Sequence, residues 1–77
     1  MASPDTLDSR RARFAALLAD HHGLLRKIAW GFSTCAADRA DLMQDMAAQL
    51  WAVFPRWDGV RPFSTWAYRV ALNVALG

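Results

Sequence analysis

The sequence predicts an all-α fold, a compact bundle of three to four helices. Apolar side chains recur at three- and four-residue steps, which is the spacing of one helix face. No segment alternates apolar and polar residues with the period of two that strands require. The 77 residues suffice for a single domain with a small core.

The first helix is expected to cover roughly 20 residues after a flexible leader at residues 1–9, so that the domain spans residues 10–77. Gly23 lies inside this helix and is expected to bend or interrupt it. The apolar stripe of the helix consists of Phe14, Leu17, Leu18, His21, Leu25, Ile28 and Phe32.

A second helix is expected from about Ala37 to Phe54, where Pro55 ends it. A loop at residues 55–62 follows and contains an Asp-Gly turn signal. The buried side of the second helix is expected to hold Leu42, Met46, Leu50, Val53 and Phe54.

A third helix is expected to begin at Ser64, which is a favourable N-cap residue, with Phe63 packing back onto Tyr68. Its apolar stripe consists of Trp66, Val70 and Val74. A neighbouring face carries Thr65, Arg69 and Asn73 at four-residue steps.

Composition excludes several classes of protein. Hydrophobic residues make up 55% and charged residues 21%, which argues against a disordered chain. The uncharged stretches are too short to cross a bilayer, and the start of the chain lacks a signal-peptide pattern. The single cysteine, Cys35, cannot form an internal disulfide, which fits the cytoplasm. The net charge of +2 is too small to indicate nucleic-acid binding by itself.

The sequence does not indicate an enzyme, and we expect no cofactor, metal or small-molecule substrate. His21 and His22 point about 100° apart on a helix, so they cannot chelate one metal ion from one face. Cys35 lacks a partner at CxxC spacing, and no glycine-rich phosphate loop is present.

Three aspartates form a stripe on the second helix beside two glutamines, Gln44 and Gln49. Asp38, Asp41 and Asp45 fall at i, i+3 and i+7. Acidic residues in the first turns favour the helix dipole by about 0.3–1 kcal/mol each, so a solvated face is one interpretation. A docking face for a basic partner helix is the other, and the spacing alone leaves both open.

The four tryptophans fall into two groups. Trp30, Trp51 and Trp66 lie on or near apolar stripes and are expected to anchor the core. Trp57 lies in the loop between arginines, where an aromatic ring can stack on an unpaired base. The alternative is that Trp57 folds back to cover the small core.

Two motifs, in order and at a fitting distance, resemble region 2 of bacterial sigma factors. Residues 38–51, DRADLMQDMAAQLW, are similar to the family pattern D-A-E-D-L-V-Q-E followed by an apolar run ending in L-W. Residues 63–73, FSTWAYRVALN, are similar to F-x-T-W-L-Y-R-I-A-x-N. The similarity is greatest to the extracytoplasmic-function group and covers the chain from about Phe14 onward, which implies the helical fold of that domain.

The resemblance implies a partner for the acidic helix. Sigma factors bind core RNA polymerase and direct it to promoters, and this helix docks on the clamp coiled-coil of the largest polymerase subunit. Carboxylate and amide groups can meet arginines of such a helix through charge-assisted hydrogen bonds. The implied polymerase-binding residues are Asp38, Asp41, Leu42, Gln44, Asp45 and Gln49.

The resemblance also implies that the loop and third helix recognise and open the promoter −10 element. In the family, a base of the non-template strand is flipped into a pocket formed by this loop. Unstacking a base costs a few kcal/mol, which stacking and hydrogen bonds to the base can offset. The implied DNA-binding residues are Trp57, Asp58, Gly59, Val60, Arg61, Ser64, Thr65, Arg69 and Asn73.

The chain departs from the family pattern at several points. Arg39 and Ala40 replace an Ala-Glu pair, and Ala67 replaces a leucine. The helix-turn-helix domain that reads the −35 element, region 4, does not follow within these residues. An anti-sigma factor is a further partner that the resemblance allows. A helical protein–protein interaction module without DNA binding is the alternative function.

Overall fold

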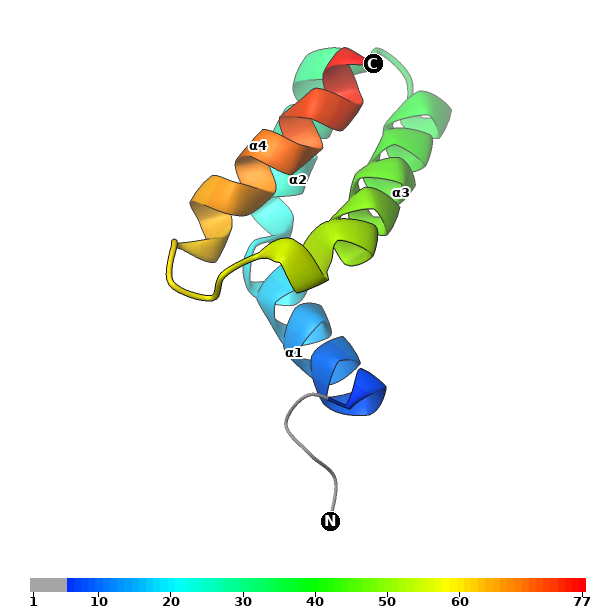
Figure 1. The fold of residues 1–77 in the computed structure, drawn as a ribbon. Helices are drawn as coiled ribbons and strands as arrows, with labels where there is room; N and C mark the ends of the chain where they lie inside the picture. Colours follow the sequence, from blue (N-terminus) through cyan, green and yellow to red (C-terminus); the bar gives the residue numbers. More distant parts are fainter. Residues whose placement is uncertain (1–5) are drawn as a thin grey trace.

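The computed structural model describes residues 6–77 as four α-helices and one short 3-10 turn (Figure 1). In chain order the elements are α1 Leu7–Asp20, α2 His22–Phe32, α3 Ala36–Val53, η1 Phe54–Arg56 and α4 Phe63–Leu76. This architecture confirms the all-α fold that the apolar spacing predicts.

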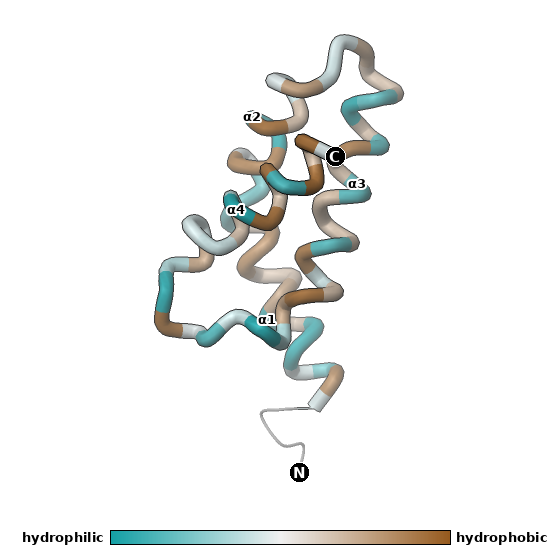
Figure 2. Tube along the Cα trace, turned by 45° about the horizontal axis from the view of Figure 1, so that its top comes forward, coloured by the Kyte–Doolittle hydropathy of each residue, from teal (hydrophilic) through white to brown (hydrophobic). Residues whose placement is uncertain are grey.

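Helices α2, α3 and α4 pack against one another, and α1 extends beyond them from the start of α2 (Figure 1). The end of α4 lies near the turn between α2 and α3, whereas the loop between α3 and α4 lies at the opposite end of the bundle, toward α1. Figure 2 shows hydrophobic and hydrophilic segments alternating along the helices, as expected where each helix buries one face.

Helix α1 begins earlier than the sequence pattern predicts. Thr6 is its N-cap, and the Thr6 Oγ1 accepts a hydrogen bond from the backbone N–H of Ser9 at 3.2 Å. Residues 7–9 of the expected leader therefore form the first turn of a helix. The remainder of that leader, residues 1–5, lies outside the described residues.

The single first helix of the prediction is in fact two helices, because the chain turns at His21. The backbone N–H of His21 donates to the carbonyls of Leu17 and Leu18, and its own carbonyl accepts from Leu24. Its ring Nδ1 also lies 2.8 Å from the Leu17 carbonyl oxygen, which can only accept, so Nδ1 carries the hydrogen. Gly23, expected to cause the interruption, lies inside the first turn of α2.

Helix α3 begins one residue before the expected start. Cys35 is its N-cap, and the Cys35 Sγ accepts from the backbone N–H of Asp38 at 3.5 Å. Met46 and Leu50 are buried as predicted, and Leu42 and Val53 are half-buried. The helix ends at Val53, and Phe54 then continues into η1.

The predicted cap of the last helix is wrong. Pro62 is the N-cap of α4, and its carbonyl accepts from the backbone N–H groups of Thr65 and Trp66. The helix therefore starts at Phe63, which leaves Ser64 inside the first turn rather than before it. Phe63 is buried, whereas Tyr68, its expected packing partner, is exposed.

Small residues form the contact between α2 and α4. Ala29, Ala67 and Ala71 are almost fully buried, so the two backbones can approach closely. The expected apolar stripe of α4, made of Trp66, Val70 and Val74, is half-buried and faces α3 instead. Ala67, which replaces the leucine of the family pattern, is thus part of the helix contact itself.

A cluster of aromatic rings joins α1, α3, the loop and α4 around Phe54. The Phe54 ring centroid lies 5.0 Å from that of Phe14 on α1 and 6.4 Å from that of Trp51 on α3. It also lies 5.9 Å from the Trp57 ring in the loop and 6.3 Å from the Phe63 ring on α4. The junction between α3 and α4 is therefore fixed by aromatic packing.

Two apolar residues of α2 do not belong to the core, contrary to the sequence interpretation. Trp30 is 58% exposed and Phe32 is 48% exposed. Ile28 and Ala29 face the core, so Trp30, about 100° further round the helix, faces outward. Its ring is covered instead by the Arg39 guanidinium, whose central carbon lies 3.4 Å from the ring centroid.

We predict that Phe54→Ala lowers the free energy of unfolding by about 3–5 kcal/mol, because it leaves a cavity between four elements. Phe32→Ala removes the same side chain from a half-exposed position and is expected to cost below about 1 kcal/mol. Urea unfolding followed by circular dichroism measures both. Equal destabilisation by the two substitutions would contradict a core centred on Phe54.

Candidate functional site

The three aspartates of α3 lie on one exposed face. Asp38, Asp41 and Asp45 are all exposed, as both sequence interpretations require. Together with Leu42 and Gln49 they fall within an arc of about 100° around the helix axis. We call these five residues the acidic face. Within residues 6–77 no ion pair engages these three carboxylates, so all three are open to a partner.

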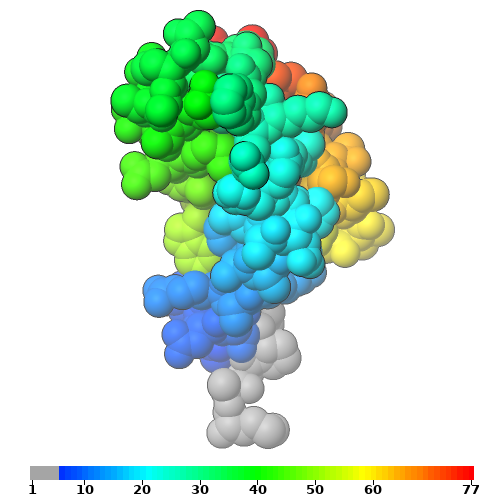
Figure 3. Space-filling model, turned by 180° about the vertical axis from the view of Figure 1, so that it is seen from behind, coloured from blue at the N-terminus to red at the C-terminus, as the bar shows by residue number. Residues whose placement is uncertain are grey.

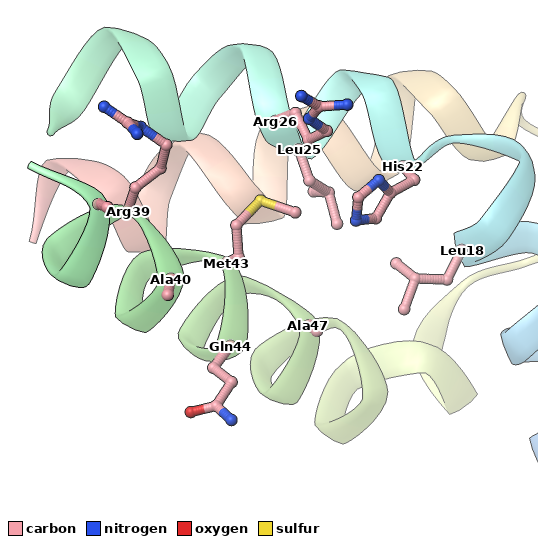
Figure 4. Close-up of a pocket in the computed structure, with 10 residues that line it drawn as sticks. Leu18, His22, Leu25, Arg26, Arg39, Ala40, Met43, Gln44 and Ala47 are labelled. Atoms are coloured by element: carbon pink, nitrogen blue, oxygen red, sulfur yellow. The ribbon is translucent and has the colours of Figure 1, made fainter.

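Gln44 borders a different feature, an apolar groove of about 560 Å³ between α2 and α3. In Figure 4, Met43 and Leu25 point into this groove, whereas Gln44 points away from α2. Figure 3 shows the same side of the molecule, with α2 and α3 lying next to each other. The rim carries His22, Arg26 and Arg39. The surface beside α3 thus presents carboxylates on one side and the guanidinium groups of Arg26 and Arg39 on the other.

The loop between α3 and α4 is held by the side chain of Asp58. Its Oδ1 accepts from the backbone N–H of Val60 at 2.9 Å and from that of Arg61 at 3.0 Å. The Arg61 Nε lies 3.7 Å from Oδ2, an exposed ion pair that adds little. Gly59 takes a φ of +75°, which favours glycine. Asp58 is therefore used within the loop, and Val60, 87% exposed, forms its tip.

Trp57 folds back onto the core, as one of the two sequence interpretations of its position expects. Its ring centroid lies 5.4 Å from that of Phe63 and 6.2 Å from that of Trp66. Its Nε1–H donates to the Arg61 carbonyl at 3.0 Å. The indole thus connects the loop to the aromatic cluster, and its hydrogen bond holds the Arg61 end of the loop.

Thr65, Arg69 and Asn73 form one exposed stripe along α4, as their four-residue spacing predicts. Ser64 does not join them, because it is half-buried and lies about 140° round the helix from Arg69. Three of the four α4 residues implied to bind DNA thus share one exposed face of the helix that follows the loop.

A second groove, of about 360 Å³, runs between α3 and α4 beside this stripe. Gln49 and Arg56 line it from one side, and Trp66 and Asn73 line it from the other. Gln49, implied to bind polymerase, therefore reaches a groove that it shares with an implied DNA-binding residue. It is the one residue that connects the acidic face to the α4 side of the molecule.

Charge is divided unequally between the first half of α3 and the part of the chain that follows it. Residues 36–45 contain three aspartates and one arginine, and residues 46–77 contain three arginines and one aspartate. The lone aspartate of the second region, Asp58, is already engaged by the loop. The exposed cations Arg56, Arg61 and Arg69 therefore lie where a nucleic-acid strand would be attracted.

Comparison with known proteins decides the family. The family model described as Sigma-70 region 2 matches residues 17–76. The chain belongs to the sigma-70 region 2 family. Searches of curated proteins and of solved structures found no match.

Membership of the sigma-70 region 2 family implies a role in transcription initiation, with core RNA polymerase and promoter DNA as partners. The family is not enzymatic. Within residues 6–77, no group of three His, Cys, Asp or Glu side chains is placed to hold a metal ion. No helix of that same region is long and apolar enough to cross a membrane.

Sequence reasoning missed two residues of this sigma-70 region 2 domain. Arg56 lines the α3/α4 groove, and its place beside the loop was visible in the sequence. Arg13 of α1 lies over the Trp57 ring, with its guanidinium carbon 5.0 Å from the centroid. No spacing rule could have found Arg13, because the contact joins two distant segments of the chain.

The loop gives a prediction for acid pH. The backbone N–H groups of Arg61 and Val60 beside Asp58 hold the pKa of its carboxyl below the ordinary value of 3.8. The pKa of Asp58 is lower in the folded loop than in the unfolded chain. The ionised carboxylate therefore stabilises the loop fully at pH values above the pKa of the unfolded chain. That contribution is lost as the pH falls through the folded value.

Carboxyl NMR titration is expected to give Asp58 a midpoint below 3.8, with the Val60 and Arg61 amides losing protection over the same range. Asp58→Asn keeps an acceptor oxygen and should remove this pH dependence while retaining protection. Asp58→Ala should expose both amides at neutral pH. A midpoint at or above the ordinary value would contradict this account of the loop.

Proposed function

We propose that this domain is region 2 of an extracytoplasmic-function sigma factor. In this proposal α3 docks on the clamp coiled-coil of core RNA polymerase, through Asp38, Asp41, Leu42, Gln44, Asp45 and Gln49. The α3–α4 loop and the α4 stripe recognise and melt the promoter −10 element. The motifs at residues 38–51 and 63–73 support the assignment to this group.

The observation that carries the proposal is the separation of an exposed acidic face from an exposed basic loop and stripe on one small core. The polymerase contact needs carboxylates without internal partners, so that arginines of a partner helix can reach them. Asp41 and Asp45 meet this requirement, since both are exposed on α3. The apolar α2/α3 groove beside Gln44 supplies further surface for a helical partner.

The DNA contact needs a loop that is ordered before it binds. The Asp58 turn and the Trp57 indole hold the loop, and its tip presents Val60 and the Arg61 side chain, which is 68% exposed. A base that leaves the stack costs a few kcal/mol, and contacts with the loop and α4 can offset this cost. Arg69 and Asn73 lie on the stripe that would follow the strand. Capture of the non-template strand favours the opened promoter without any hydrolysis.

The experiment is binding to the isolated clamp coiled-coil, comparing the native domain with the double variant Gln44→Ala, Asp45→Arg. Both side chains are exposed, so the variant should keep its helical circular dichroism. We expect binding to weaken about tenfold or more, which corresponds to about 1.4 kcal/mol. Reversing one carboxylate replaces an attractive contact with a repulsive one.

Asp20→Arg is the matched control, because it reverses an exposed aspartate on α1 rather than on α3. It should bind the coiled-coil as the native domain does. Equal loss in both variants would indicate a general charge effect. Absence of binding by the native domain would favour a helical interaction module with another partner, an anti-sigma factor among them.

A further inference from the structure

Arg13 contacts the loop from outside, although it lies on α1. Its guanidinium carbon lies 5.0 Å from the Trp57 ring centroid, a cation–π distance. A Cβ built on Gly59 would lie 3.4 Å from the Arg13 Nη2, so the same side chain also borders the turn. Arg13 thus contacts Trp57 and lies close to Gly59, the two loop residues on either side of Asp58.

The next residue on α1 explains why Arg13 is held in this place. Phe14 is buried, and its ring centroid lies 5.0 Å from that of Phe54 and 5.3 Å from that of Trp51. Phe14 therefore fixes α1 against the same cluster on which Trp57 packs. Because successive helical residues point about 100° apart, burial of Phe14 leaves Arg13 at the edge of the cluster, over the indole.

We propose that Arg13 is a positioning residue that braces the α3–α4 loop. Its guanidinium covers the outer face of Trp57, whose Nε1–H donates to the Arg61 carbonyl. Loss of the guanidinium frees the indole to move, and the Arg61 end of the loop moves with it. The link to DNA rests on the proposed function, since it requires that this loop bind the strand. The brace itself requires only the free protein.

The first test needs no DNA. Solvent exchange of the Trp57 indole N–H is measured by NMR on ¹⁵N-labelled protein, with Trp57→Phe identifying the signal. Arg13→Ala should speed this exchange about two- to fivefold, the range expected for loss of a cation–π contact at an exposed site. The other three indoles should not change. The exchange rate in Arg13→Lys, which keeps the charge but not the planar group, should lie between those of the native protein and Arg13→Ala.

Arg11→Ala is the control, because it removes the same charge from an exposed position of the same helix. It should leave the Trp57 exchange rate unchanged. Unchanged exchange in Arg13→Ala, with thermal unfolding showing an intact fold, would overturn the brace. A change of equal size in Arg11→Ala would also overturn it.

The second test measures affinity for a fluorescein-labelled, randomised single-stranded 12-mer at several salt concentrations. A positioning role predicts weaker binding by Arg13→Ala than by Arg11→Ala, with the same salt slope in both. A slope reduced by about 0.7 in Arg13→Ala alone would mean a direct phosphate contact and would overturn the positioning role. If the native domain does not bind the strand, the proposed function fails, and the exchange data still decide the brace.

Discussion

The packing of Phe54 between four segments is the constraint on which the rest of this domain depends. Its ring meets Phe14 on α1, Trp51 on α3, Trp57 in the loop, and Phe63 on α4. Each aromatic pair adds about 0.5–1.5 kcal/mol beyond the burial of its area. In a domain of 77 residues the core is small, so these contacts of one ring are a large part of what holds α1, the loop and the start of α4 to α3.

This arrangement makes the loop part of the core rather than a separate appendage. Trp57 packs on Phe54, and Asp58 closes the turn that follows. The exposed residues at the tip are therefore held by buried or half-buried neighbours on both sides. Preorganisation of this kind lowers the entropy lost when a strand binds, and that loss opposes affinity wherever a loop must be ordered during binding.

Helical periodicity in the sequence was sufficient to predict the fold class and most core positions. Leu25, Ile28, Met46 and Leu50 are buried as expected. Periodicity could not predict the break at His21, which depends on backbone and ring hydrogen bonds to the preceding turn. Nor could it predict that Trp30 is exposed and that Trp57 packs on the core, because exposure of an aromatic ring is decided by contacts with distant segments. Trp30 meets Arg39, whereas Trp57 meets Phe54.

In the candidate site, too, spacing within one helix was predictable from the sequence, whereas contacts between helices were not. Spacing along one helix placed Asp38, Asp41 and Asp45 on one face and Thr65, Arg69 and Asn73 on another, as the structure shows. Contacts between helices could not be predicted from this spacing. The position of Gln49 in the groove between α3 and α4 was therefore not expected. The central claim is that the α3–α4 loop and the α4 stripe bind single-stranded DNA. NMR chemical-shift mapping with a single-stranded 12-mer tests it most directly. The account predicts saturable shifts at residues 57–61 and along the α4 stripe, with the acidic face unchanged. Shifts concentrated on α2 and the acidic face would contradict it.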